Sequence, residues 1–152
     1  MKLAEALILR ADLQKRVEQI KSRLISYAKV QEGEIPAENP QDLLDELEKV
    51  RQQLTELIKR INRTNGTVKF NDTDTISDIL TEREQIWNKR MILSHLTEAA
   101  MIKHDRYSRS ELRYLSTVNV KDLQKQVDEL SRQYRELDTR IQEKNWTIDL
   151  MQ

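Results

Sequence analysis

The sequence predicts a mainly α fold: four long antiparallel amphipathic helices, as two hairpins or one bundle, in a single helical domain spanning residues 1–152. Charged residues make up 34% of the chain, which has only two Gly and two Pro, a composition typical of long helices with charged outer faces. Apolar residues recur at alternating spacings of four and three, which places them along one stripe of a helix. Breaks near residues 31–41, 65–75 and 105–119 leave four helical segments.

The first helix is expected from about Leu3 to Val30, since Gly33 and Pro36 prevent it from continuing. Ahead of its regular stripe, the segment Ala6–Leu9 is apolar over a wider face. The stripe itself consists of residues four and three apart: Leu13, Val17, Ile20, Leu24 and Tyr27.

The second helix is expected to begin with Asn39 as its N-cap and Pro40 at the first helical position, where a missing N–H removes no hydrogen bond. The pair Asn65–Gly66 is expected to end it in a left-handed conformation. Its stripe keeps the same spacing: Leu43, Leu47, Val50, Leu54, Leu57 and Ile61.

Residues 67–75 are expected to form a small β-hairpin around Asn71–Asp72, because β-branched residues dominate its arms.

The third helix then runs to about His104, and its second half, Met91–Ile102, is apolar nearly all round, which predicts burial on more than one side. Residues 113–118 offer a further short strand. The fourth helix carries a last regular stripe, formed by Val120, Leu123, Val127, Leu130, Tyr134, Leu137 and Ile141. The apolar tail that follows this helix is expected to dock against the rest of the protein.

Charge and composition exclude several functional classes. The chain has 26 basic and 26 acidic residues and no cysteine, which argues against nucleic-acid and anionic-membrane partners and excludes disulfides and thiol catalysis. No apolar run is long enough to span a bilayer, and the first ten residues do not resemble a signal peptide. We therefore expect a cytoplasmic protein that binds neither nucleic acid nor a membrane.

One basic segment, Lys103–Arg113, is a candidate site for a small anionic ligand such as a phosphate, because Arg guanidinium groups match such anions and hydroxyls add donors. The interpretation that we favour is an ordered connector whose Arg side chains pair with acidic residues of this chain or a neighbour. In the first interpretation, the second helix also contributes, and the candidate anion-binding residues are Arg106, Tyr107, Ser108, Arg109, Arg113, Asn62, Arg63 and Asn65.

Neither a metal site nor a catalytic site is expected. His95, Glu98 and His104 are the only conceivable metal ligands, and a metal site within a helical bundle needs paired Glu-x-x-His motifs that the chain lacks. No nucleophile elbow, P-loop or dinucleotide-binding glycine pattern is present. The sequence therefore predicts no catalytic residues and no cofactor.

Self-association is expected instead, because surplus apolar faces would leave larger exposed patches than monomers usually carry. Residues 31–50 have a net charge of −6 and residues 1–30 of +4, and this acidic segment, set against a basic region of a partner copy, would favour one register. The sequence thus favours a homo-oligomeric, non-enzymatic scaffold or adaptor; the alternative is an anion-binding protein or enzyme. The candidate oligomer contacts are Leu7, Leu9, Met91, Ile92, Met101 and Ile102.

Several stretches together resemble a family of small bacterial proteins often labelled "septicolysin": residues 1–7, 29–34, 60–65, 105–111 and 143–146. The resemblance spans the chain and departs from the usual pattern at Asn71–Asp72, where Asp-Gly is common, which leaves the turn type open. It implies a protein of unknown function without established catalytic residues. The label implies a cytolysin, but narrow apolar stripes and mixed-charge outer faces argue against pore formation.

Overall fold

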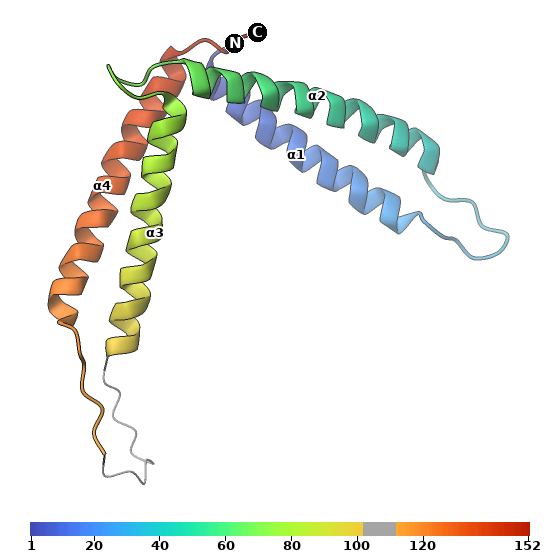
Figure 1. The fold of residues 1–152 in the computed structure, drawn as a ribbon. Coiled ribbons are helices and arrows are strands. Elements are labelled where there is room, and N and C mark those ends of the chain that lie inside the picture. The colour runs from blue at the N-terminus through green and yellow to red at the C-terminus, as the bar shows by residue number, and fades with distance from the viewer. Residues whose placement is uncertain (102–111) are drawn as a thin grey trace. The chain divides into compact units, whose positions relative to one another are not determined.

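The computed structural model describes residues 1–101 and 112–152, and the described part of the chain is helical, without strands. Its four helices are α1 (Leu3–Ser26), α2 (Pro40–Thr67), α3 (Ile76–Ala100) and α4 (Val120–Thr147) (Figure 1). The predicted fold class is therefore confirmed. The chain divides into two compact units: unit 1 contains Met1–Ser77 and Gln142–Gln152, and unit 2 contains Asp78–Ile141.

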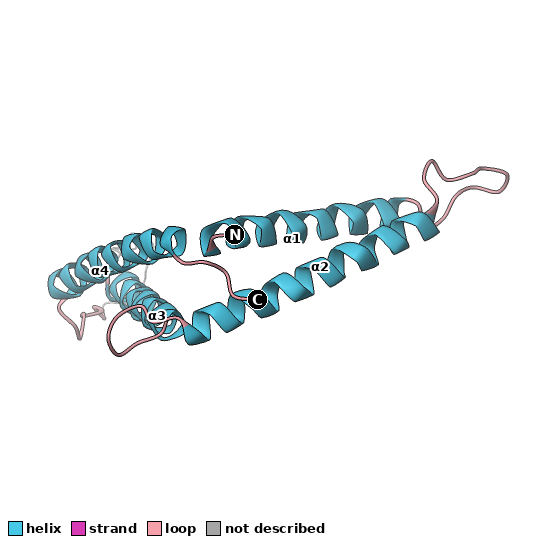
Figure 2. Cartoon of the chain, turned by 90° about the horizontal axis from the view of Figure 1, so that it is seen from above, coloured by secondary structure: helices cyan, strands magenta, loops and turns pink. Residues whose placement is uncertain are grey.

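Unit 1 is built on the antiparallel pair α1 and α2, which lie side by side (Figure 2). The predicted stripes supply its core: Leu13, Ile20, Leu43, Val50, Leu57 and Ile61 are buried. Above this core, Arg16 of α1 donates to Glu46 of α2 with Nη2 at 2.7 Å from Oε1, and Arg23 is paired with Glu38. Both acidic partners belong to the 31–50 segment, so part of its negative charge is balanced within the same hairpin.

The start of α2 follows the sequence prediction. Asn39 is the N-cap, its side chain accepts a hydrogen bond from the Gln41 N–H at 2.9 Å, and Pro40 occupies the first turn. The end of α1 differs from the prediction, because the helix stops at Ser26 rather than near Val30. There the Ala28 N–H bonds the Ile25 carbonyl three residues back, the tighter pattern that commonly closes a last helical turn.

The predicted stop of α2 at Asn65–Gly66 is wrong. The helix continues to Thr67, where the Val68 N–H bonds the Thr64 carbonyl at 2.9 Å, and Gly33, in the loop before α2, is the described glycine with a positive φ, 87°. The reason lies in packing: Thr64 is fully buried beneath the end of the chain, which holds the last turns of α2 helical.

The expected β-hairpin is reduced to one isolated bridge between Lys69 and Thr75. The Asn71 side chain closes the turn, since its Oδ1 accepts hydrogen bonds from the N–H groups of Thr73 and Asp74, leaving too few residues for a ladder. The strand expected at 113–118 is also absent from the described residues. There the Ser116 hydroxyl bonds the main chain of Val118, a local turn in place of strand pairing.

The two ends of the chain described here pair with each other in unit 1. Lys2 and Asp149 form an antiparallel bridge, the Leu3 N–H bonds the Ile148 carbonyl, and the Leu150 N–H bonds the Met1 carbonyl, both at 2.9 Å. Leu150 is buried, so the prediction that the tail docks is confirmed.

Unit 2 is an antiparallel pair formed by α3 and α4, and the stripe of α4 is largely buried against α3 at Leu123, Val127, Leu130 and Ile141. The outcome for α3 differs from the prediction. Ile92, Leu96 and Met101 are exposed, so the described residues do not bury the second half of α3 on more than one side.

Candidate functional site

The candidate anion-binding residues do not come together as one described site. Arg106, Tyr107, Ser108 and Arg109 lie outside the described residues. Arg113 is exposed ahead of α4 in unit 2, whereas Asn62, Arg63 and Asn65 lie near the end of α2 in unit 1. The anion-binding interpretation therefore stays a hypothesis.

The Arg side chains near the end of α2 bind main-chain carbonyls of the tail. Arg63 donates to the main-chain carbonyl of Gln152, and Nε of Arg60 donates to the carbonyl of Met151 at 3.0 Å. Thr64 adds a third link, because its hydroxyl oxygen accepts the Met151 N–H at 3.0 Å and donates to the Arg60 carbonyl. These contacts attach the tail to α2 and engage one of the predicted anion-binding residues.

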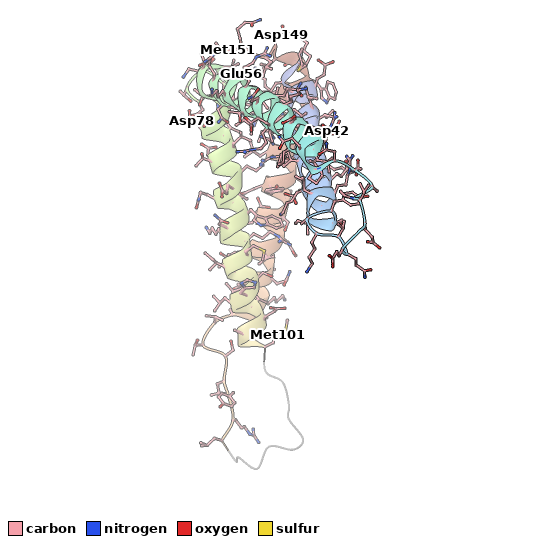
Figure 3. All side chains as sticks on the ribbon, turned by 90° about the vertical axis from the view of Figure 1, so that its right-hand side faces the viewer. Asp42, Glu56, Asp78, Met101, Asp149 and Met151 are labelled. Carbon is pink, nitrogen blue, oxygen red and sulfur yellow. The ribbon has the colours of Figure 1, made fainter. Side chains whose placement is uncertain are left out.

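At the same end of unit 1, Lys2 bridges to the tail (Asp149 and Met151 are labelled in Figure 3). Its Nζ lies 2.8 Å from Oδ1 of Asp149 and donates to the Thr147 carbonyl at 3.1 Å. The Lys2 ammonium, through its hydrogen bond, holds the pKa of the Asp149 carboxyl below its ordinary value. The arrangement is an exposed ion pair and a hydrogen bond that connect the two ends of the chain.

Within residues 1–101 and 112–152, no three His, Asp or Glu side chains are grouped so that they could hold a metal ion. His95 is exposed on α3, as is Glu98, and His104 lies outside the described residues. None of the helices in these ranges is long and apolar enough to cross a membrane.

The candidate oligomer contacts fall on two helices in different units. On α1, Leu7 is half-buried and Leu9 is exposed; on α3, Met91 is half-buried, and Ile102 lies outside the described residues. Ile92 is 66% exposed, and Met101 is exposed at the end of α3 (Figure 3). Of the six predicted contacts, Leu9, Ile92 and Met101 are thus exposed.

Sequence reasoning missed three exposed apolar side chains in the segment that leads into α4. Leu112, Tyr114 and Leu115 are 85%, 89% and 81% exposed. We use the name distal surface for these three side chains together with Ile92, Leu96 and Met101, the exposed apolar side chains of the second half of α3 and of the residue that follows it. In the sequence, apolar residues on either side of Arg113 have the same pattern as a short strand.

A stack of side chains joins α3 and α4 within unit 2. The rings of Trp87 and Tyr134 lie 5.3 Å apart, tilted at 53°, and the Arg90 guanidinium lies 4.9 Å from the centre of the Trp87 ring. Nε of Arg90 also donates to the Ser131 hydroxyl at 2.6 Å, and the Arg83 guanidinium is paired with Asp138. Because aromatic pairs and cation–π contacts are directional, the stack holds the two helices in register.

A family model described as "Family of unknown function (DUF6847)" matches residues 10–150. The chain belongs to this family. The chain is also similar to a solved structure, described as the crystal structure of a functionally unknown conserved protein from Corynebacterium diphtheriae, with 40% identity, a TM-score of 0.93 and coverage of 99% of each chain. No curated protein matches the chain.

At 40% identity over the whole length, this DUF6847 chain and the diphtheria protein share their fold. Both matches are described as of unknown function, so the candidate site of this DUF6847 chain is argued from its own residues. Of the surfaces described above, the distal surface is the one that no described part of the chain covers.

Proposed function

We propose that this DUF6847 protein is a cytoplasmic, non-enzymatic interaction protein that self-associates and acts as a scaffold or adaptor. The observation that supports it is the distal surface, where six large apolar side chains of unit 2 are exposed. Contact of large apolar side chains with water is unfavourable, and a concentration of them in one part of a protein favours a binding surface.

The composition of this surface fits a protein partner. Interface cores are enriched in aromatic residues, Met and Arg, and this surface combines Tyr114 and Met101 with the adjacent, exposed Arg113. A second copy of the chain is always present at the same concentration, and closed homo-oligomers are the commonest soluble assemblies. The motifs that resemble septicolysin-labelled proteins bring no toxin role into the proposal, since the exposed positions of α1, α2 and α4 carry mixed charges.

Sedimentation velocity over a range of micromolar concentrations tests the proposal. We expect wild type to sediment above its chain mass of 18.1 kDa and Ile92→Asp to shift towards that mass, because a carboxylate in an apolar interface loses its hydration. Ile92 is mostly exposed within the chain, so this substitution spares the fold.

The matched control is Gln85→Asp, which places the same charge on the same face of α3, seven residues earlier and outside the distal surface. It should sediment like wild type. A wild-type protein that stays at 18.1 kDa at every concentration would contradict self-association. An Ile92→Asp variant that associates like wild type would show that the distal surface is not the interface.

A further inference from the structure

The loop between α1 and α2 and the start of α2 carry further exposed apolar side chains, in a segment of opposite charge to the distal surface. In the loop Ile35 is 90% exposed and Val30 is exposed, and Leu44 is exposed in α2. Residues 29–45, which we call the acidic tip, contain five acidic residues and one basic residue, a net charge of −4.

Part of this negative charge is already used within unit 1. Glu38 is paired with Arg23, and Asp45 accepts a hydrogen bond from the Gln41 amide at 3.0 Å. Glu32 and Glu34 are exposed, and across the described residues neither forms an ion pair. Both precede Ile35 in the same loop, so the acidic tip places an exposed apolar side chain close in sequence to two exposed carboxylates.

The distal surface has the reverse arrangement. Arg113 lies directly beside Tyr114 and Leu115, and Lys121 lies in the first turn of α4; both are exposed, and neither forms an ion pair in the part of the chain that the structure describes. Among the described residues at this end of unit 2, 101 and 112–121, these two are the charged residues, a net charge of +2. Its apolar side chains therefore stand beside a positive rim.

We propose that the acidic tip of one copy docks on the distal surface of a second copy, an inference that rests on the self-association proposed above and names the partner of that same surface. Apolar side chains would meet at the centre, and Glu32 and Glu34 would face Arg113 and Lys121 at the rim. Interfaces commonly combine an apolar core with a polar rim, and opposite charges across a rim select the partner and the register.

In this docking two different patches of the chain meet, and each copy carries one of each. If two copies exchange both contacts, the dimer is two-fold symmetric and its interface is isologous; if each copy docks on the next one, the contacts are heterologous and can close into a ring. The chain has no net charge, so attraction between copies depends on these local patches rather than on a global field.

Charge reversal tests the docking in the full chain. One variant combines Glu32→Lys with Glu34→Lys, and a second combines Arg113→Glu with Lys121→Glu. All four residues are exposed, and a glutamate at position 121 suits the positive end of the α4 dipole, so both variants should keep wild-type circular dichroism. We expect each variant alone to associate about tenfold or more weakly than wild type, since like charges then face each other.

An equimolar mixture of the two variants is the decisive sample. Each reversed tip then meets a reversed distal surface, opposite charges are restored, and the mixture should associate to the wild-type mass by sedimentation velocity. The control variant, Asp12→Lys with Glu84→Lys, makes the same charge change as the Glu32→Lys, Glu34→Lys variant at exposed positions outside both patches and should associate like wild type. Raised salt should weaken wild-type association, because exposed charges are screened.

The outcomes separate this inference from the proposed function. If wild type associates and both reversed variants do so equally well, the docking is wrong while self-association stands. If each variant is monomeric and the mixture stays monomeric, the two patches are not each other's partners, and the docking is again wrong. A wild type that never associates contradicts both proposals.

Discussion

The hydroxyl oxygen of Thr64 accepts a hydrogen bond from the main-chain N–H of Met151 at 3.0 Å, across 87 positions of the sequence. Thr64 is fully buried on α2, and its hydroxyl also donates to the Arg60 carbonyl at 2.8 Å. One side chain thus links the last turns of α2 to the tail that follows α4.

Replacing this hydroxyl should loosen the tail. Thr64→Val keeps the shape of the side chain but leaves the Met151 N–H without its acceptor, and a buried unsatisfied donor costs about 1–3 kcal/mol. We expect faster hydrogen exchange at Met151 and a matching loss in the free energy of unfolding, whereas Thr64→Ser should behave like wild type. Unchanged exchange at Met151 in the valine variant would show that the contact does not hold the tail.

The core of unit 1 can be tested with two isoleucines on α1. Ile20 is 1% exposed and Ile25 is 67% exposed, so the same substitution samples core and surface. Ile20→Ala should lower the free energy of unfolding by about 2–5 kcal/mol, and Ile25→Ala by no more than about 0.5 kcal/mol. Chemical denaturation followed by circular dichroism measures both, and similar losses for the two variants would contradict the assignment of the stripe.

The side-chain stack of unit 2 should be visible in fluorescence. In a Trp146→Phe background, Trp87 is the remaining tryptophan, and Tyr134→Ala removes the ring 5.3 Å from it. We expect a red-shifted emission and a loss of about 1–3 kcal/mol in stability, from the aromatic pair and the buried area together. Tyr134→Phe keeps the ring and should retain both properties; a phenylalanine variant as damaged as the alanine variant would argue against ring contact as the cause.

The pairing of Arg23 with Glu38 predicts a pH effect of defined sign. The hydrogen bond from the Arg23 guanidinium lowers the pKa of the Glu38 carboxyl from its ordinary value. A carboxyl with a lowered pKa in the folded state contributes stability above its unfolded pKa, of about 4.3 for a glutamate, and this contribution is lost as the pH falls through the folded pKa.

Carbon-detected NMR titration of the glutamate side chains measures this directly. In wild type, Glu38 should titrate below its ordinary pKa, and Arg23→Ala should return it to that value. Glu129 provides an internal control, because its pKa is lowered mainly by hydrogen bonding to Arg132 on α4, and it should not respond to Arg23→Ala. An ordinary Glu38 pKa in wild type would contradict the pairing.

Features that depend on neighbouring residues in the chain could be predicted from the sequence. The N-cap at Asn39, the Pro40 start and the stripes of α1, α2 and α4 all follow from side chains within a few turns of one another, because helix initiation and amphipathicity are local properties. The exposed second half of α3 was visible too, as an excess of apolar residues, although its degree of burial was predicted wrongly.

For the candidate site, the sequence identified Ile92 and Met101. It missed Leu112, Tyr114 and Leu115, because apolar residues around an Arg have the same pattern in a strand and in an exposed segment. Nor could it show that Arg63 engages the Gln152 carbonyl. That contact joins residues far apart in the chain, and no local pattern specifies which distant acceptor an Arg will find.

By itself, then, the sequence determined that this protein is four amphipathic helices, where three of them carry their apolar stripes, and where α2 begins. Only the tertiary structure decided that α2 continues through Gly66, that Arg16 and Arg23 take Glu46 and Glu38 as partners, and that the two chain ends pair. The physical reason is that helix formation depends on interactions within one or two turns, whereas where a helix stops and which charges pair depend on residues that only folding brings together.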